Sequence, residues 1–216
     1  MFSRKCTRLI SVSLLFYLLA WYSRIFLNEN TEELLVSMWN RAFQRFGPDC
    51  IYWITMRLAA WITIYLHLLR LEGGFTVYLF LRKRSYGRVF VGTYIGCVGL
   101  AVCYYGVGTV IMAICHGIVL PGIEVGNLLG QRGLPLILVE EGLEALSFCL
   151  TAYVVHCLFR KAETGFLAVL VGRMILNFVT GGIRPELLVQ MAFNLIMTYL
   201  VFLMAFRDFA EKFIEG

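Results

Sequence analysis

Six long apolar segments constrain this sequence more than any other feature. A helix that crosses a bilayer needs about 20 mostly apolar residues. The six segments that meet this need are Leu9–Leu27, Cys50–Leu71, Val89–Leu120, Leu136–Phe159, Gly165–Gly182 and Leu187–Phe206. The chain is 60% hydrophobic and 15% charged, whereas soluble domains are about 45–50% apolar and about 25% charged. The sequence therefore predicts an all-α integral membrane protein, a single polytopic domain over residues 1–216 with six transmembrane helices.

The basic residues between these segments predict an orientation. With the N-terminus inside, twelve Lys and Arg residues fall in cytoplasmic segments and four in outer loops. The inner twelve are Arg4, Lys5, Arg8, Arg70, Arg82, Lys83, Arg84, Arg88, Arg160, Lys161, Arg207 and Lys212. Cytoplasmic loops carry such an excess, so we expect both termini in the cytoplasm. The same location explains the net charge of +5 without nucleic acid as a partner.

The N-terminal region predicts two further elements. The first apolar segment lacks a small-residue cleavage site, so we expect a retained helix rather than a signal peptide. In the outer loop that follows, apolar residues from Leu34 to Phe46 fall on one helical face. This pattern favours an amphipathic helix in the outer interface, and a packed extracellular cap is the alternative.

Ionisable and polar residues inside the spans form a predicted intramembrane charge cluster. Its members are Arg57, Glu140, Glu141, Glu144, Arg173 and Asn177. With a rise of about 1.5 Å per residue, Arg57 lies about 10 Å deep and the three glutamates about 6–12 Å deep. We expect these groups to pair inside the bundle, because an unpaired charge in the membrane is costly. The cluster is then either an ionic clamp between helices or a polar wall on a substrate path.

Small residues on the third segment form a helix-packing stripe of Gly92, Gly96 and Gly99. Such stripes let helices approach closely. The stripe predicts either tight packing within the chain or a dimer seam.

Motifs of catalysis and cofactor binding are missing from the sequence. It contains no G-x-x-x-x-G-K-[ST], no H-E-x-x-H and no G-x-S-x-G. The seven cysteines show neither a disulfide framework nor metal-ligand spacing. We therefore expect no enzyme activity, no cofactor and no metal in this chain.

The most concentrated basic stretch leads to a family resemblance. The segment YLFLRKRSYGRVFVGTYIGCVGLAVCYYG passes from apolar residues through a basic turn into the third helix. With six spans and cytoplasmic ends, it resembles the permease subunits of bacterial type-two ABC exporters, in the class of peptide or bacteriocin export and self-immunity. The short outer connection between the last two helices departs from that family, in which re-entrant helices often fill this place.

The resemblance implies a multi-pass transport subunit of the bacterial plasma membrane. It implies partners, namely an ABC ATPase subunit that carries the ATP and Mg, a second permease copy or paralogue, and membrane lipids. The segment Glu72–Arg88 would be the cytoplasmic coupling helix that docks into the ATPase. Its expected contacts are Phe75, Tyr78, Leu79, Phe80, Arg82, Lys83, Arg84 and Arg88. The substrate would be amphipathic, a peptide or a lipid-like molecule.

Other interpretations of the sequence stay open. The basic stretch also fits a lipid-bound loop without a protein partner. The chain as a whole could be the substrate-capture subunit of a vitamin importer, or a non-catalytic membrane assembly or immunity protein.

Overall fold

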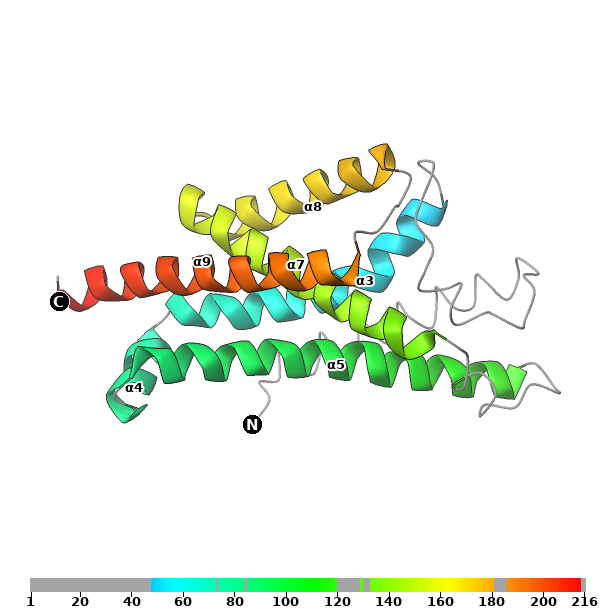
Figure 1. The fold of residues 1–216 in the computed structure, drawn as a ribbon, viewed down its shortest axis with the longest axis horizontal. Coiled ribbons are helices and arrows are strands. Elements are labelled where there is room, and N and C mark those ends of the chain that lie inside the picture. The colour runs from blue at the N-terminus through cyan, green and yellow to red at the C-terminus, as the bar shows by residue number, and fades with distance from the viewer. Residues whose placement is uncertain are drawn as a thin grey trace. The chain divides into compact units, whose positions relative to one another are not determined.

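The computed structural model describes residues 48–72, 74–83, 85–119, 129, 133–180 and 186–214 (Figure 1). The expected first span Leu9–Leu27, the expected outer interfacial helix and Arg84 lie outside these residues. The described elements are helical: α3 (Pro48–Leu68), the 3₁₀ helix η2 (Leu69–Glu72), α4 (Gly74–Lys83), α5 (Tyr86–Val119), α7 (Leu134–Phe159), α8 (Ala162–Val179) and α9 (Leu187–Ile214). No strand occurs in this part of the chain.

Four of these helices are long and apolar enough to cross a membrane. Their spans are Tyr86–Ile111, Leu134–Phe159, Ala162–Val179 and Leu187–Glu211. A fifth span is possible if Arg57–Glu72 and Thr76–Arg82, which meet at a 64° bend, count as one broken span. For the described residues, the prediction of an all-helical chain is confirmed, with four or five helices apolar enough to span a membrane; the prediction of six spans stays a prediction.

The helix α5 is longer than one span requires. It is one helix of 34 residues, or about 51 Å at 1.5 Å per residue, against about 30 Å of hydrocarbon. A helix of this length exceeds the thickness of the hydrocarbon core, so α5 either tilts in the membrane or continues beyond it. Helix α9 continues past the predicted end of its segment at Phe206, to Ile214.

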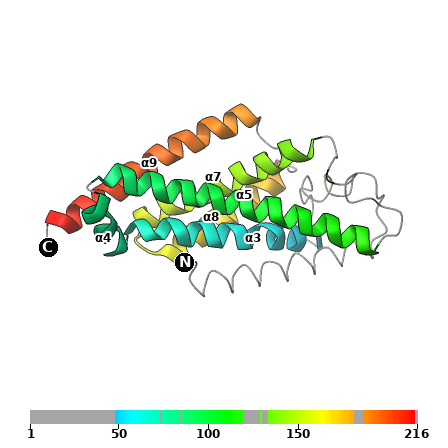
Figure 2. The ribbon, with the colours of Figure 1, turned by 90° about the horizontal axis from the view of Figure 1, so that it is seen from below.

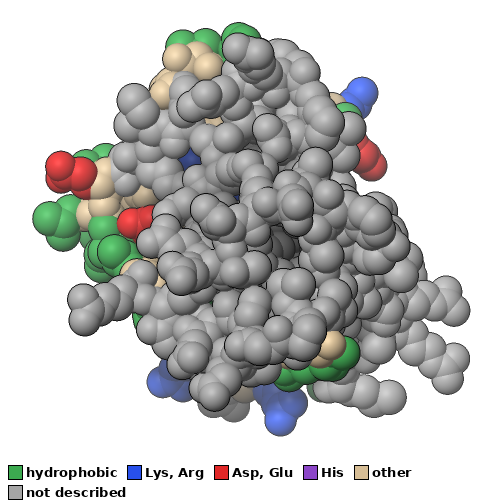
Figure 3. All heavy atoms as spheres, turned by 90° about the vertical axis from the view of Figure 1, so that its right-hand side faces the viewer, with side chains coloured by type: hydrophobic (Ala, Val, Ile, Leu, Met, Phe, Trp, Pro, Cys, Tyr) green, Lys and Arg blue, Asp and Glu red, His purple; other side chains and the backbone are tan. Residues whose placement is uncertain are grey.

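The surfaces of the last helices are apolar and exposed. Only 6% of the α8 span is buried, and α9 exposes large side chains such as Leu188, Leu195 and Tyr199. Figure 3 shows hydrophobic side chains at the surface of one face of the molecule. Soluble proteins rarely expose such patches, and a bilayer can cover them, which suggests a membrane-embedded protein.

The chain divides into two compact units. Unit 1 comprises Met1–Ala60, Val102–Gly142 and Leu176–Arg184, and unit 2 comprises Trp61–Ala101, Leu143–Ile175 and Pro185–Gly216. Within unit 1, the buried residues include Tyr105, Ala113 and Ile137 together with two charged side chains described below.

Unit 2 has an aromatic core. The ring of Trp61 stacks on that of Phe148, with centroids 4.1 Å apart, and Phe166 packs against Phe148 and Tyr65 at 5.2 and 5.4 Å. These rings join α3, α7 and α8. Aromatic pairs of this kind contribute about 0.5–1.5 kcal/mol beyond their buried area.

A close approach of two backbones holds α8 against α7 in unit 2. Helix α7 ends where Arg160 adopts a left-handed conformation with φ of 55°, and its N–H donates to the His156 carbonyl at 2.7 Å. The chain then enters α8, and a Cβ atom added to Gly165 would lie 2.7 Å from both the Ala152 oxygen and the His156 nitrogen. Only glycine fits at this contact.

Candidate functional site

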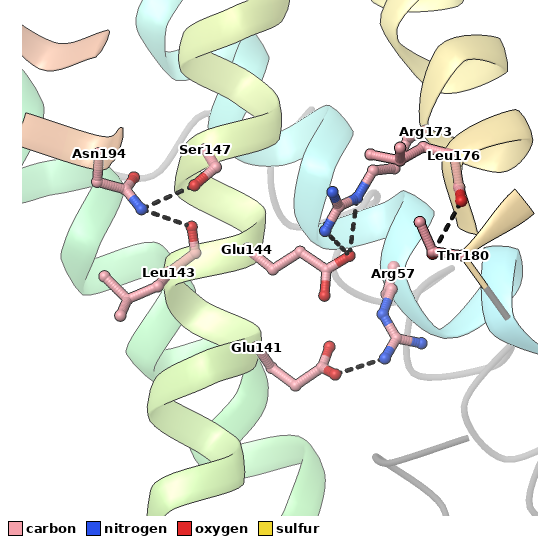
Figure 4. Close-up of polar contacts among 9 residues, drawn as sticks. All are labelled: Arg57, Glu141, Leu143, Glu144, Ser147, Arg173, Leu176, Thr180 and Asn194. Carbon is pink, nitrogen blue, oxygen red and sulfur yellow. Dashed lines mark hydrogen bonds and ion pairs between the residues drawn. The ribbon is translucent and has the colours of Figure 1, made fainter. Parts of the chain in front are cut away.

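The first buried ion pair lies in unit 1 and joins α3 to α7. The guanidinium of Arg57 pairs with the carboxylate of Glu141 (Figure 4), and their side chains are 1% and 0% exposed. The attraction between unlike charges is strong in a medium of low dielectric constant. Each charge is therefore neutralised by the other at a depth where neither meets solvent.

A second ion pair lies in unit 2 and joins α7 to α8. The Nε and Nη2 atoms of Arg173 lie 3.2 and 3.0 Å from the same oxygen of Glu144. Here the arginine is 32% exposed and the glutamate 9% exposed. Glu144 lies three residues after Glu141, and residues three apart lie on one helical face, so α7 carries both acidic partners on one side.

An amide in unit 2 extends the polar contacts of α7 to α9. The side-chain nitrogen of Asn194 donates to the Leu143 carbonyl at 3.1 Å and to the Ser147 hydroxyl at 2.7 Å (Figure 4). Asn194 is 4% exposed. Our sequence analysis missed this residue, although a polar side chain inside a predicted span is itself a signal of a packed contact.

The structure also describes the other two members of the predicted cluster. Glu140 is half-buried on α7, beside the glutamate that pairs with Arg57. Asn177 is half-buried on α8, and its side-chain nitrogen has no hydrogen-bond partner among the residues that the structure describes. The polar contacts of α7 thus reach α3, α8 and α9.

The three glycines of the predicted stripe have different surroundings on α5. A Cβ atom at Gly96 would lie 2.5 Å from the Nε2 atom of His67, whereas a Cβ atom at Gly99 would have no neighbour within 4 Å. Gly92 and Gly99 are exposed. The structure therefore brings one of the three against a side chain of α3, and leaves two on the surface of the chain.

The predicted coupling segment contains α4 and the start of α5. Thr76 is buried, and its hydroxyl donates to the Arg70 carbonyl at 2.6 Å. The ring of Phe80 lies 4.9 Å from that of Phe209, and Figures 1 and 2 both show α4 beside the C-terminal part of α9. One face of α4 is thus held by the chain itself.

The opposite face of α4 is exposed. Tyr78 is 60% and Leu81 64% exposed, Arg82 is also exposed, and Leu79 is half-buried. Arg88, at the start of α5, is exposed as well. Leu81 was absent from the predicted contacts, although it lies three residues after Tyr78, where a helix presents the same face. The side chains of Phe75, Lys83 and Arg84 lie outside the description.

The chain was compared with known protein families, curated proteins and solved structures. No protein family, no curated protein and no solved structure matches this chain.

Proposed function

We propose that this chain is the membrane-spanning permease subunit of an ATP-driven ABC transporter in a bacterial plasma membrane. Its substrate is amphipathic, a peptide or a lipid-like molecule, and ATP is hydrolysed on a separate subunit. The observation that carries the proposal is α4, a short helix with basic residues at its end, placed at a 64° bend after α3 and η2 and immediately before α5.

The two faces of α4 support a docking role. The buried Thr76 and the contact of Phe80 with Phe209 fix the helix to its own chain. The exposed Tyr78 and Leu81, followed by Arg82, offer an apolar contact with a basic rim. Interfaces with partner proteins use apolar or aromatic anchors surrounded by a polar rim, and a coupling helix needs the same arrangement.

The rest of the proposed architecture follows from the sequence pattern. Leu9–Leu27 completes six spans, both termini lie in the cytoplasm, and a second permease copy or paralogue completes the pathway. In this architecture the ion pairs of α7 keep its packing against α3 and α8 constant during the transport cycle.

The experiment that tests the proposal is copurification of ATPase activity. The tagged chain is purified in mild detergent from its native host, and ATP hydrolysis is measured per molecule of the chain. We expect Tyr78→Ala and Leu81→Ala to lower the copurified activity, because an interface anchor contributes about 2 kcal/mol or more, which is about thirtyfold in affinity. Tyr199→Ala is the matched control, since this tyrosine is 62% exposed on the apolar surface of α9.

Each alternative gives a different result in the same preparation. Wild-type protein that carries no ATPase activity contradicts the proposal. A bound vitamin in that ATPase-free protein would identify a capture subunit. Neither an ATPase nor a vitamin would indicate an assembly or immunity protein.

A further inference from the structure

We propose that Glu72, Cys157 and Asp208 form a binding site for a divalent transition-metal ion of the zinc class. The three residues come from η2, α7 and α9, all within unit 2. One carboxylate oxygen of Glu72, the Cys157 sulfur and one carboxylate oxygen of Asp208 all lie within 4.8 Å of one another. The chain therefore brings three potential ligand atoms to one place from positions far apart in the sequence.

The mixture of donors decides the class of metal. Calcium and magnesium bind almost entirely through oxygen, whereas zinc accepts thiolate, carboxylate and imidazole ligands. The Cys157 sulfur lies 3.9 Å from Oε1 of Glu72. A sulfur and an oxygen on one tetrahedral zinc ion, at about 2.3 and 2.1 Å from the metal, would lie about 3.6 Å apart. A small adjustment of side chains brings the two atoms to that separation.

The surroundings of Glu72 resemble the outer shell of a metal centre. Its second oxygen, Oε2, lies 2.7 Å from Nε2 of the buried His156, while Oε1 is the oxygen nearer to Cys157. Ligating carboxylates are commonly fixed by hydrogen bonds of this kind. The hydroxyl of Tyr153 also lies beside Glu72 and Cys157, which places a further polar group at the cluster.

A buried hydroxyl supplies an independent indication of a ligand. Tyr86 is 5% exposed, and its hydroxyl has no hydrogen-bond partner among the described residues. The same hydroxyl is within electrostatic reach of Asp208, Cys157 and Glu72. A buried donor without an acceptor costs about 1–3 kcal/mol, and a water molecule on the bound ion would accept from it.

The local charge also favours a cation. Two carboxylates and a thiol that ionises on metal binding carry more negative charge than the nearby Arg207 balances. That arginine is 63% exposed, and its Nη2 atom lies 4.0 Å from Oδ1 of Asp208.

A metal ion bound at this site would connect η2 to α7 and α9. Since η2 leads directly into α4, the ion would also fix the start of α4. This inference does not depend on the transport function proposed above.

Cobalt binding to the full-length protein in detergent tests the site. Protein freed of metal by a chelator is titrated with Co²⁺, whose bond to a thiolate gives a charge-transfer band in the near ultraviolet. We expect saturation at one cobalt per chain and loss of the band when Zn²⁺ is added. Cys157→Ser should abolish the band, and Cys103→Ser, which changes an exposed free thiol on α5, should retain it.

A second variant keeps the test decisive if Cys157→Ser misfolds, which size-exclusion chromatography would reveal. Asp208→Asn should keep the thiolate band but weaken cobalt binding about tenfold or more, because it removes one ligand. Wild-type protein without a thiolate band overturns the proposal, whatever the variants do. A band that persists in Cys157→Ser, or unchanged affinity in Asp208→Asn, overturns it as well.

Discussion

Arg57 of α3 and Glu141 of α7 form an ion pair in which both side chains are almost fully buried, at 1% and 0% exposure. Such a pair does not by itself make a protein more stable than an apolar contact of equal volume would. The pair instead disfavours other packings of α3 and α7, because any packing that separates the two groups leaves a charge buried alone. The pair therefore selects one register of the two helices.

The first prediction concerns loss of one partner from this pair. Glu141→Ala strands the Arg57 guanidinium, and we expect it to lower the free energy of unfolding by about 3–5 kcal/mol, the usual cost of breaking a buried pair. The double variant Arg57→Ala/Glu141→Ala should recover part of this loss. Thermal unfolding in detergent measures both. Combining Arg57→Ala with Glu163→Ala, which removes an exposed glutamate, should give additive effects. Additive losses in the Arg57 and Glu141 double variant would show that the two groups do not interact.

The second prediction concerns the pair of Glu144 and Arg173. Because Arg173 is 32% exposed, its long side chain can extend toward the polar headgroup region once its partner is gone. We expect Glu144→Ala to cost about 1–3 kcal/mol, less than Glu141→Ala in the same assay. An equal or larger loss would mean that Arg173 is more deeply enclosed than its exposure indicates.

The third prediction tests the contact of α8 with α7. Gly165→Ala places a Cβ atom 2.7 Å from backbone atoms of Ala152 and His156, and backbone cannot move aside as a flexible side chain can. We expect a loss of about 1–3 kcal/mol, the usual cost of overpacking. Gly172→Ala on the same helix meets nothing within 4 Å and should be neutral or stabilising by up to about 1 kcal/mol. Similar melting temperatures for the two variants would rule out this close approach.

The fourth prediction concerns orientation. If the basic excess places the α4–α5 junction in the cytoplasm, then Ser85→Cys will not react with a membrane-impermeant maleimide in intact cells but will react after permeabilisation. Gln131→Cys, in the expected outer loop, should react in both. The unsubstituted chain gives the background from native cysteines. Efficient labelling of Ser85→Cys from outside would reverse the proposed topology.

The sequence predicted the apolar helices well and their ends less well. The expected Leu136–Phe159 differs from α7 by two residues, because hydropathy changes sharply at both ends. The expected last segment ended at Phe206, where charged residues begin, yet α9 continues to Ile214. The cause lies in packing: Phe209 contacts Phe80 and Tyr86, and no count of apolar residues along one segment can anticipate a contact with another.

The choice of ion-pair partners could not be predicted either. Depth along the spans placed Arg57 and the glutamates at a similar level, but Glu140 and Glu141 point about 100° apart around the helix. Which of them faces Arg57 depends on how α3 and α7 are rotated, and packing sets that rotation. The proposed metal ligands escaped prediction for a related reason, since Glu72, Cys157 and Asp208 follow no local spacing.

The shortness of α8 has a consequence for the membrane around it. Its 18 residues extend about 27 Å at 1.5 Å per residue, slightly less than an average hydrocarbon core of about 30 Å. A span that is too short makes the bilayer thin locally or draws flanking residues inward. Because almost all of α8 faces outward, lipid thickness acts on it directly. Among the described spans, acyl chains of increasing length should therefore strain α8 before the longer ones, which makes it the span most sensitive to lipid composition.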